Sequence, residues 1–196
     1  MTFIATVPES SAGDDLSAIY TSAQEALGYV PNYTRTFSHR PELYRAWTNL
    51  VKNVSSVMDP RRYELATMGA AITLRSSYCT LAHGEKLLGL GWTEDEVRSL
   101  TAPDFGEDLS PDESAIVRYA AKVTGDASSV TETDIEELRG HGLTDAEIFD
   151  VAAAAAARSF FSKVLDATGT LPDPVFMEKI PGLVEDLSVG RRIEPE

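Results

Sequence analysis

The sequence holds one cysteine and three histidines in 196 residues, and its basic side chains are few beside its acidic ones. A single cysteine, Cys79, excludes an intrachain disulfide framework and a zinc site built from several cysteines. The 17 basic and 31 acidic side chains give a formal net charge of −14. This balance argues against nucleic acid or an anionic membrane surface as a partner, because both bind clustered positive charge.

Long apolar runs are also missing. No stretch reaches the ~18 consecutive apolar residues of a membrane helix, and Met1 to Ser10 lack the basic start and apolar core of a signal peptide. We therefore expect a cytoplasmic protein. A hydrophobic content of 43% is that of an ordinary globular chain. We expect a single domain over residues 1–196, with an extended N-terminus (1–13), a helical core (14–170) and a C-terminal arm (171–196).

Strand signals are absent, since β-branched residues do not alternate anywhere for long. Apolar residues instead recur at helical spacing behind capping residues. This pattern predicts an all-α fold. The expected helices run from Asp14 to Leu27, from Pro41 to Met58, from Pro60 to the Arg75 region, through Cys79 to about Leu88, from Thr93 to Leu100, from Ser110, from Thr131, and from Thr144 to about Ala167.

The last of these helices contains Ala152 to Ala157 without interruption, which predicts a central, buried helix that neighbouring helices or subunits approach closely. Prolines recur from Leu171 onward, so we expect an extended arm with at most a turn or two of helix. Such an arm should wrap a neighbouring subunit or lack structure. Gly91–Val97 resembles Gly142–Ile148, which suggests two similar helical halves.

A possible thiol site surrounds the cysteine. Cys79 and His83 are four residues apart, so they share one helix face. If Ser76 or Ser77 caps this helix, Cys79 lies in its first turn, where the helix dipole stabilises a thiolate and the imidazole can carry its proton. Glu64 can complete a proton relay if the helix that carries it packs beside the helix of Cys79 and His83. The alternative is that the cysteine is a small buried apolar residue, as free cysteines often are.

Residues 60–90 also resemble the carboxymuconolactone decarboxylase/AhpD-like family of alkylhydroperoxidase proteins. The family pattern is a Glu, a Cys-x-x-Cys that begins twelve residues later, and a His four residues after the second Cys. Glu64, Cys79 and His83 fit three of these positions, and Ser76 stands where the first Cys would be. Tyr78 is also typical of the pattern.

The resemblance extends outward. Gly28–Asn32, His39–Leu43 and Arg158–Ser162 resemble the "peroxidase-related" branch of the family. It implies an AhpD-like helical bundle that assembles into homo-oligomers, commonly trimers or hexamers, without haem, metal or another cofactor. Glu64, His83 and Glu85 do not have a spacing that specifies a metal site.

The resemblance also assigns roles, with one departure. Cys79 would be the nucleophile toward a small organic hydroperoxide, with His83 and Glu64 as proton relay and Ser76 or Tyr78 orienting the thiolate. Because Ser76 replaces the first Cys, no internal disulfide can form. Three options remain: a sulfenic acid on Cys79 that an external thiol or a peroxiredoxin reduces, another covalent step, or loss of redox function.

Two other functions stay open. A lyase of the carboxymuconolactone decarboxylase type would need cations to hold its substrate, and Arg75 is the nearest candidate in the sequence. A non-enzymatic, oligomeric scaffold or redox-sensing protein of the same fold would instead have a buried and unreactive Cys79.

Overall fold

The computed structural model describes residues 2–105 and 109–195, and within these ranges every regular element is helical. The all-α prediction is therefore confirmed. None of these helices is long and apolar enough to cross a membrane. The elements are η1 (Glu9–Ser11), α1 (Asp14–Leu27), α2 (Asn32–Thr36), α3 (Pro41–Ser55), α4 (Pro60–Thr73), α5 (Ser77–Gly89), α6 (Glu94–Ser99), η2 (Pro103–Phe105), α7 (Pro111–Asp126), η3 (Ala127–Ser129), α8 (Glu132–Gly140), α9 (Asp145–Ala167), α10 (Phe176–Lys179) and α11 (Val184–Leu187).

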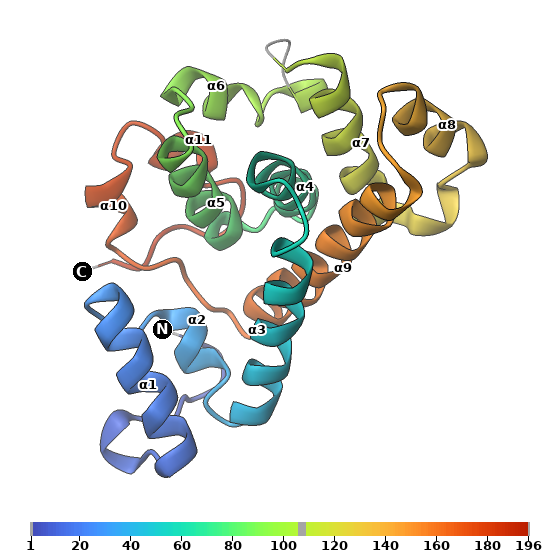
Figure 1. The fold of residues 1–196 in the computed structure, drawn as a ribbon. Coiled ribbons are helices and arrows are strands. Elements are labelled where there is room, and N and C mark those ends of the chain that lie inside the picture. The colour runs from blue at the N-terminus through green and yellow to red at the C-terminus, as the bar shows by residue number, and fades with distance from the viewer. Residues whose placement is uncertain (1, 106–108, 196) are drawn as a thin grey trace.

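Helix α4 is the centre of the molecule and packs against α5, α7 and α9 (Figure 1). Its small residues permit this close packing. At Gly69 an added Cβ would lie 2.7 Å from the carbonyl oxygen of Val117, so α7 can approach only a glycine there. The side chains of α4 that are fully enclosed belong to Leu65, Ala66, Met68, Ala70 and Ala71.

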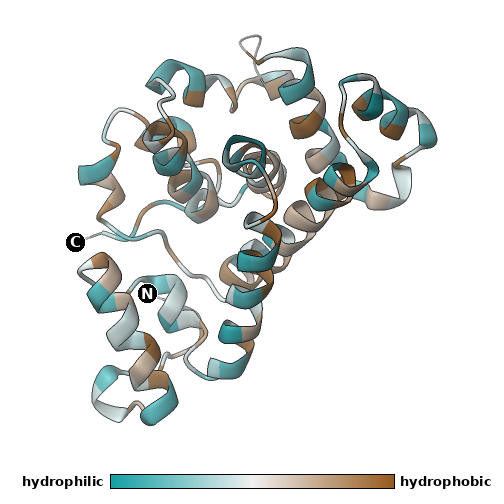
Figure 2. Ribbon diagram, viewed as in Figure 1, coloured by the Kyte–Doolittle hydropathy of each residue, from teal (hydrophilic) through white to brown (hydrophobic). Residues whose placement is uncertain are grey.

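The prediction that the alanine-rich helix would be the buried centre was wrong. Helix α9 packs against α4, α7 and α3, but its remaining face is open: Ala156 is exposed, and Phe149 is 71% exposed. The outer helices differ from this face of α9, because Figure 2 shows hydrophilic stretches along α6 and α8. The alanines of α9 therefore serve close packing on one side only.

Two corners of the chain repeat the same geometry. Gly91 and Gly142 both adopt the left-handed conformation, with φ of 93° and 89°. Each is followed by a buried apolar residue and then by a capping box, Thr93 with Glu96 and Thr144 with Glu147. The similarity between the two sequence segments thus corresponds to two equivalent helix starts.

The C-terminal arm covers its own chain. It is extended, with the short helices α10 and α11, and Figure 1 places both beside α5. The N–H of Gly190 donates to the Ser77 hydroxyl at 2.7 Å. The alternative that the arm lacks structure was wrong, because its apolar residues recur at helical spacing and fill the surface of α5. Those buried residues are Phe176, Ile180, Leu183 and Leu187.

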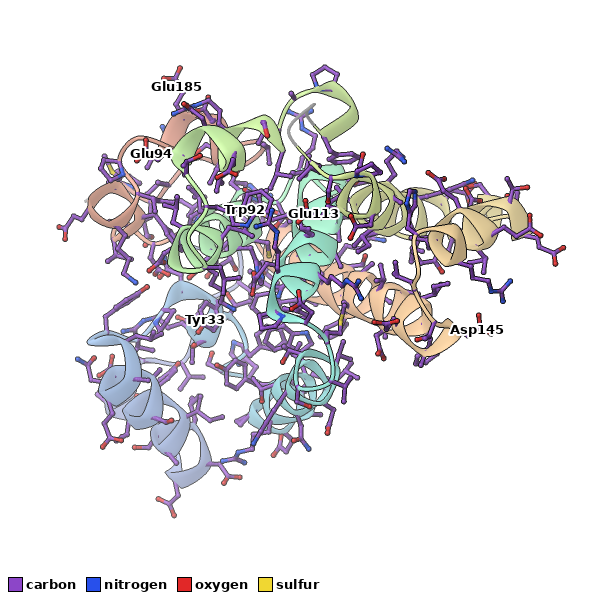
Figure 3. All side chains as sticks on the ribbon, turned by 45° about the horizontal axis from the view of Figure 1, so that its top comes forward. Tyr33, Trp92, Glu94, Glu113, Asp145 and Glu185 are labelled. Atoms are coloured by element: carbon purple, nitrogen blue, oxygen red, sulfur yellow. The ribbon has the colours of Figure 1, made fainter. Side chains whose placement is uncertain are left out.

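Helix α2 begins directly after Pro31 and is not among the helices expected from the sequence. A distant residue holds its first turn, since the N–H of Asn32 donates to Asp173 at 2.9 Å. Tyr33, labelled in Figure 3, lies where the N-terminal helices meet the rest of the molecule, with its ring against those of Tyr78 and Phe161. Because this helix depends on tertiary contacts, local sequence signals did not reveal it.

Candidate active site

Cys79 is the third residue of α5, directly after the corner that joins α4 to α5. At this corner Arg75 adopts a left-handed conformation with φ of 54°, and the N–H of Ser76 donates to the carbonyl of Ala71 at 2.9 Å. The N–H of Cys79 donates to the Ser76 carbonyl at 3.0 Å. Cys79 therefore lies in the first helical turn, as the sequence predicted, and the turn-back of the chain brings α5 alongside α4.

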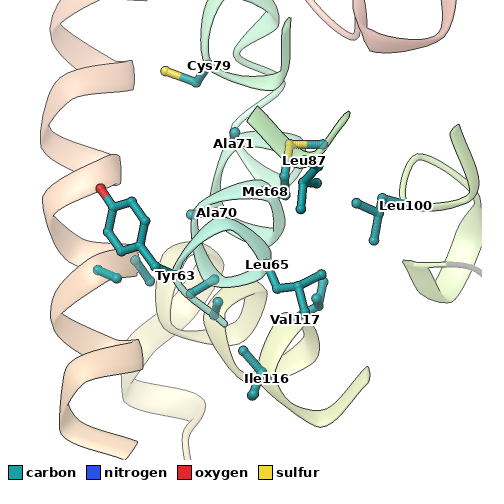
Figure 4. Packing of buried hydrophobic residues seen from close by; sticks show 14 of the residues in the cluster. Tyr63, Leu65, Met68, Ala70, Ala71, Cys79, Leu87, Leu100, Ile116 and Val117 are labelled. Carbon is teal, nitrogen blue, oxygen red and sulfur yellow. The ribbon is translucent and has the colours of Figure 1, made fainter. Parts of the chain in front are cut away.

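The sulfur of Cys79 faces α9 (Figure 4), and two polar side chains of that helix contact it. The hydroxyl of Ser162 donates to Sγ at 3.1 Å, and the guanidinium of Arg158 donates to it at 3.6 Å. Cys79 is 1% exposed and Arg158 is 5% exposed. A donor and a cation at a buried sulfur favour negative charge on that sulfur.

Arg158 is a buried cation that pairs with no carboxylate of the described residues. None of the ion pairs in the described ranges includes it, and its Nε has no hydrogen-bond partner there. Burial opposes the charge of Arg158, but Cys79 and Tyr63 outweigh this effect and raise its pKa above the ordinary value. A buried charge of this kind needs polar or anionic partners, and Cys79 and Tyr63 are the two groups that interact with it favourably.

His83 and Glu64 form a buried hydrogen-bonded pair. Nδ1 of His83 contacts Oε2 of Glu64, and the Thr67 hydroxyl lies 3.3 Å from the same nitrogen. On the other side of Glu64, Nζ of Lys86 lies 3.8 Å from Oε1. The two helices therefore bring together the carboxylate and the imidazole that the sequence grouped with Cys79.

The protonation states of this pair follow from its surroundings. Burial acts to raise the pKa of Glu64, but His83, Lys86 and Arg158 together lower it below its ordinary value. Burial and the nearby Arg158 lower the pKa of His83 to about 4, although Glu64 acts in the opposite direction. At neutral pH the carboxylate is ionised and can only accept, so Nδ1 of the neutral imidazole carries the proton. Nε2 is then left as a proton acceptor.

Cys79 and His83 line one cavity of about 210 Å³. Glu64 lies behind His83 and does not line it. The cavity has an aromatic wall, in which the rings of Trp47 and Phe161 stack with their centroids 3.9 Å apart. The complete lining consists of Tyr33, Tyr44, Trp47, Thr48, Tyr78, Cys79, Ala82, His83, Lys86, Arg158 and Phe161.

The two supporting residues expected from the sequence do not orient the sulfur. Ser76 is buried, but its hydroxyl has no hydrogen-bond partner among the described residues, and Ser162 is the residue that donates to Sγ. Tyr78 lines the cavity, yet its hydroxyl donates to Asp173 in the C-terminal arm. Tyr78 therefore ties the arm to α5.

The other candidates lie away from the cavity. Arg75 donates to the carbonyl of Val189 at 3.1 Å and is exposed, so it is not available as a cation for a substrate in the cavity. Glu85 pairs with Lys179 at 2.8 Å instead of approaching His83. No three His, Cys, Asp or Glu side chains converge as metal ligands in the part of the chain that is described.

Sequence reasoning gave no role to Arg158 and Ser162, although both stand in a segment that it quoted for the family resemblance. The available signal was their spacing: two polar residues four apart on an alanine-rich helix share a face that should otherwise be apolar. Trp47, Phe161 and Lys86 were likewise not assigned to the site, because only the tertiary structure places them around Cys79.

Comparison with known proteins gives a family and a fold. Residues 41–122 match the model of the carboxymuconolactone decarboxylase family. Among solved structures, an uncharacterized peroxidase-related protein from Ralstonia eutropha JMP134, described as an alkylhydroperoxidase AhpD core, has a TM-score of 0.80 at 24% identity, over 89% of this chain and 94% of its own. A peroxidase-related protein from Silicibacter sp. TM1040 gives 0.80 at 23% identity, over 89% and 93%.

A cysteine-to-alanine variant of the debrominase Bmp8, in complex with 2,3,4-tribromopyrrole, has a TM-score of 0.72 at 15% identity, over 93% of this chain and 98% of its own. No curated protein matches the chain. At these identities the solved structures establish the fold alone. The family recognised from the sequence is thereby confirmed: residues 41–122 belong to the carboxymuconolactone decarboxylase family, and the chain around them has the fold of AhpD-like peroxidase-related proteins.

Proposed function

We propose that this protein reduces small organic hydroperoxides through Cys79. The observation that carries the proposal is the grouping around one cavity: the Cys79 sulfur, held by Arg158 and Ser162, and the His83 imidazole, held by Glu64. A stabilised sulfur anion and a neighbouring proton acceptor are the two parts that thiol-dependent peroxide reduction requires.

In the first half-reaction the thiol proton passes to Nε2 of His83, and the thiolate attacks the terminal oxygen of the hydroperoxide. An S–O bond forms and the O–O bond breaks, so the sulfur is oxidised to a sulfenic acid and the peroxide is reduced to an alkoxide. The alkoxide takes the proton from His83 and leaves as an alcohol. Glu64 holds the imidazole by its Nδ1–H and offsets the positive charge that His83 carries between the two transfers.

The second half-reaction needs an external thiol, because Cys79 is the only cysteine. One thiol condenses with the sulfenic acid, which releases water and leaves a mixed disulfide. A second thiol attacks the sulfur of the first thiol in that mixed disulfide. This step restores the Cys79 thiol and releases the two reductant molecules as one disulfide.

Trapping of the sulfenic acid tests this proposal. The native protein is treated with cumene hydroperoxide and dimedone, and mass spectrometry measures labelling of Cys79 while a thiol-coupled assay measures turnover. We expect stoichiometric labelling that depends on peroxide, and loss of turnover in Cys79→Ser. Ser162→Ala is the graded variant, because it removes one donor to Sγ and should slow labelling without abolishing it. Absence of labelling, together with unchanged turnover in Cys79→Ser, excludes the proposed function.

One observation favours a second candidate, a non-enzymatic protein of the same fold. Cys79 is 1% exposed, as an inert packing cysteine would be. Titration of the native protein with a thiol reagent separates the two functions. Reaction within seconds near neutral pH supports the enzyme, since an inert buried thiol reacts only when the protein unfolds.

A further inference from the structure

The cavity beside Cys79 is built to hold a flat ring. Five of its lining side chains are Tyr, Trp or Phe and come from four helices: Tyr33 from α2, Tyr44 and Trp47 from α3, Tyr78 from α5, and Phe161 from α9. Its volume is about 210 Å³, whereas a cavity of about 150 Å³ already accepts benzene. One substituted ring therefore fits this space, and the aromatic wall offers it stacking and edge contacts.

The charge of the lining is positive, in contrast to the chain as a whole. Arg158 and Lys86 line the cavity, and none of its described lining residues is Asp or Glu. Glu64 is separated from the cavity by His83 and lies 3.8 Å from Nζ of Lys86. The side chain of Lys86 is 58% exposed, which places its ammonium group at the rim. In a protein with a net charge of −14, such a lining indicates an anionic ligand.

The two cations serve different ends of the cavity. Arg158 contacts the sulfur, and its buried Nε has no hydrogen-bond partner among the described residues. Lys86 is seven residues after Cys79 on α5, and seven residues correspond to a rise of roughly 10 Å. A ligand that reaches both ends must therefore carry its reacting group and its anionic group on opposite sides of the ring.

We propose that the substrate is an arylalkyl hydroperoxide: its peroxy group is on a carbon attached to a single aromatic ring, and the opposite side of that ring bears a carboxylate. The ring lies among Tyr33, Trp47 and Phe161, the carboxylate pairs with Lys86, and the terminal peroxy oxygen meets the Cys79 sulfur. This assignment rests on the proposed function for its reaction, which is the same transfer of oxygen to sulfur, and adds the class of molecule that the site selects.

Binding of benzoate tests the site without any turnover. Trp47 lines the cavity, so tryptophan fluorescence of the native protein is followed as benzoate is added. We expect saturable binding, about fivefold weaker for cyclohexanecarboxylate because a saturated ring loses the aromatic contacts. Lys86→Gln should weaken benzoate binding about fivefold. Lys163→Gln, an exposed lysine on α9 outside the cavity, is the matched control and should change nothing. Equal affinities in Lys86→Gln and the native protein overturn the carboxylate assignment.

Turnover then compares cumene hydroperoxide with its para-carboxy derivative. In the native protein and in Lys163→Gln we expect the carboxylated substrate to have the higher kcat/KM by about fivefold at low salt. In Lys86→Gln the ratio should fall to about one, whereas a general effect of Lys86 on the Glu64–His83 pair would lower both values and keep the ratio. Turnover of cumene hydroperoxide without any carboxylate preference overturns this inference and leaves the proposed function standing. Benzoate binding that depends on Lys86, without turnover of either hydroperoxide, overturns the proposed function and the peroxide part of this inference together, and leaves only a binding site for aromatic carboxylates.

Discussion

Replacement of Arg158 by methionine tests the electrostatics of the site most directly. The substitution keeps a long side chain against Trp47 and Phe161, whose rings lie 5.9 Å and 5.5 Å from the guanidinium carbon, but removes the cation. Loss of one member of a buried ion pair costs about 3–5 kcal/mol. Taking about 3 kcal/mol for the contact with the sulfur, reactions in which Cys79 attacks as a nucleophile should slow about a hundredfold.

This loss should appear as reactivity and not as unfolding. Once Arg158 is gone a proton can neutralise the sulfur, and a neutral buried side chain is tolerated where an unpaired charge is not. We expect iodoacetamide to alkylate Arg158→Met about a hundred times more slowly than the native protein at neutral pH, with little change in Tm. Arg158→Lys should recover part of the rate. Arg118→Met, which removes an exposed arginine paired with Glu137, controls for net charge. If Arg158→Met is alkylated as fast as the native protein, the guanidinium does not stabilise the thiolate.

Three further predictions concern stability and assembly. The pKa of His83 is lowered to about 4 from 6.5, so between these pH values the unfolded chain binds more protons than the folded chain. The free energy of unfolding should therefore fall by about 3 kcal/mol as the pH drops through this window. Urea titrations at several pH values measure this free energy, and His83→Gln should flatten its dependence on pH. Gly69→Ala should destabilise the protein by about 1–3 kcal/mol, because the added Cβ would meet the Val117 carbonyl. Gly125→Ala is the control near the end of α7, where an added Cβ would make only an ordinary contact with Thr73. It should stabilise the protein by about 0.5–1 kcal/mol in the same denaturation assay. Phe149 is 71% exposed on α9, so we expect a second copy of the chain to cover it, and Phe149→Asp should convert an oligomer to a monomer in light scattering at unchanged Tm.

The helices could be predicted from the sequence because their ends are encoded locally. Asp59 caps α4 by accepting from the N–H of Arg62, and Thr93 and Thr144 form capping boxes at the residues where the pattern indicated them. What could not be predicted was which helix would be the most buried. The uniform apolar character of α9 suggested a central helix, yet α4 takes that place, because burial depends on which faces find a partner.

The site was predictable only along α4 and α5. Glu64, Cys79 and His83 share a segment with a helical period, so their grouping needed one assumption about how the chain turns at Arg75. Arg158 and Ser162 come from a helix about eighty residues later, and no local rule relates their position to the sulfur. The sequence therefore pointed to Ser76 as the hydroxyl beside the thiolate, whereas the structure has a serine from another helix at that place.

The enclosure of Cys79 also bears on how the sulfur would be regenerated. A partner protein such as a peroxiredoxin must bring its own cysteine to the sulfenic acid across a protein surface, which requires that Sγ be reachable from outside. Cys79 is 1% exposed, and the space next to it is a cavity of about 210 Å³ with aromatic walls. The thiol end of a small molecule can enter such a space, but the surface of a folded protein cannot. Of the two reductants that the missing first cysteine left open, we therefore expect a low-molecular-weight thiol to restore Cys79 in the native fold, and a protein thiol to do so only if α3 and its aromatic residues move away from the sulfur.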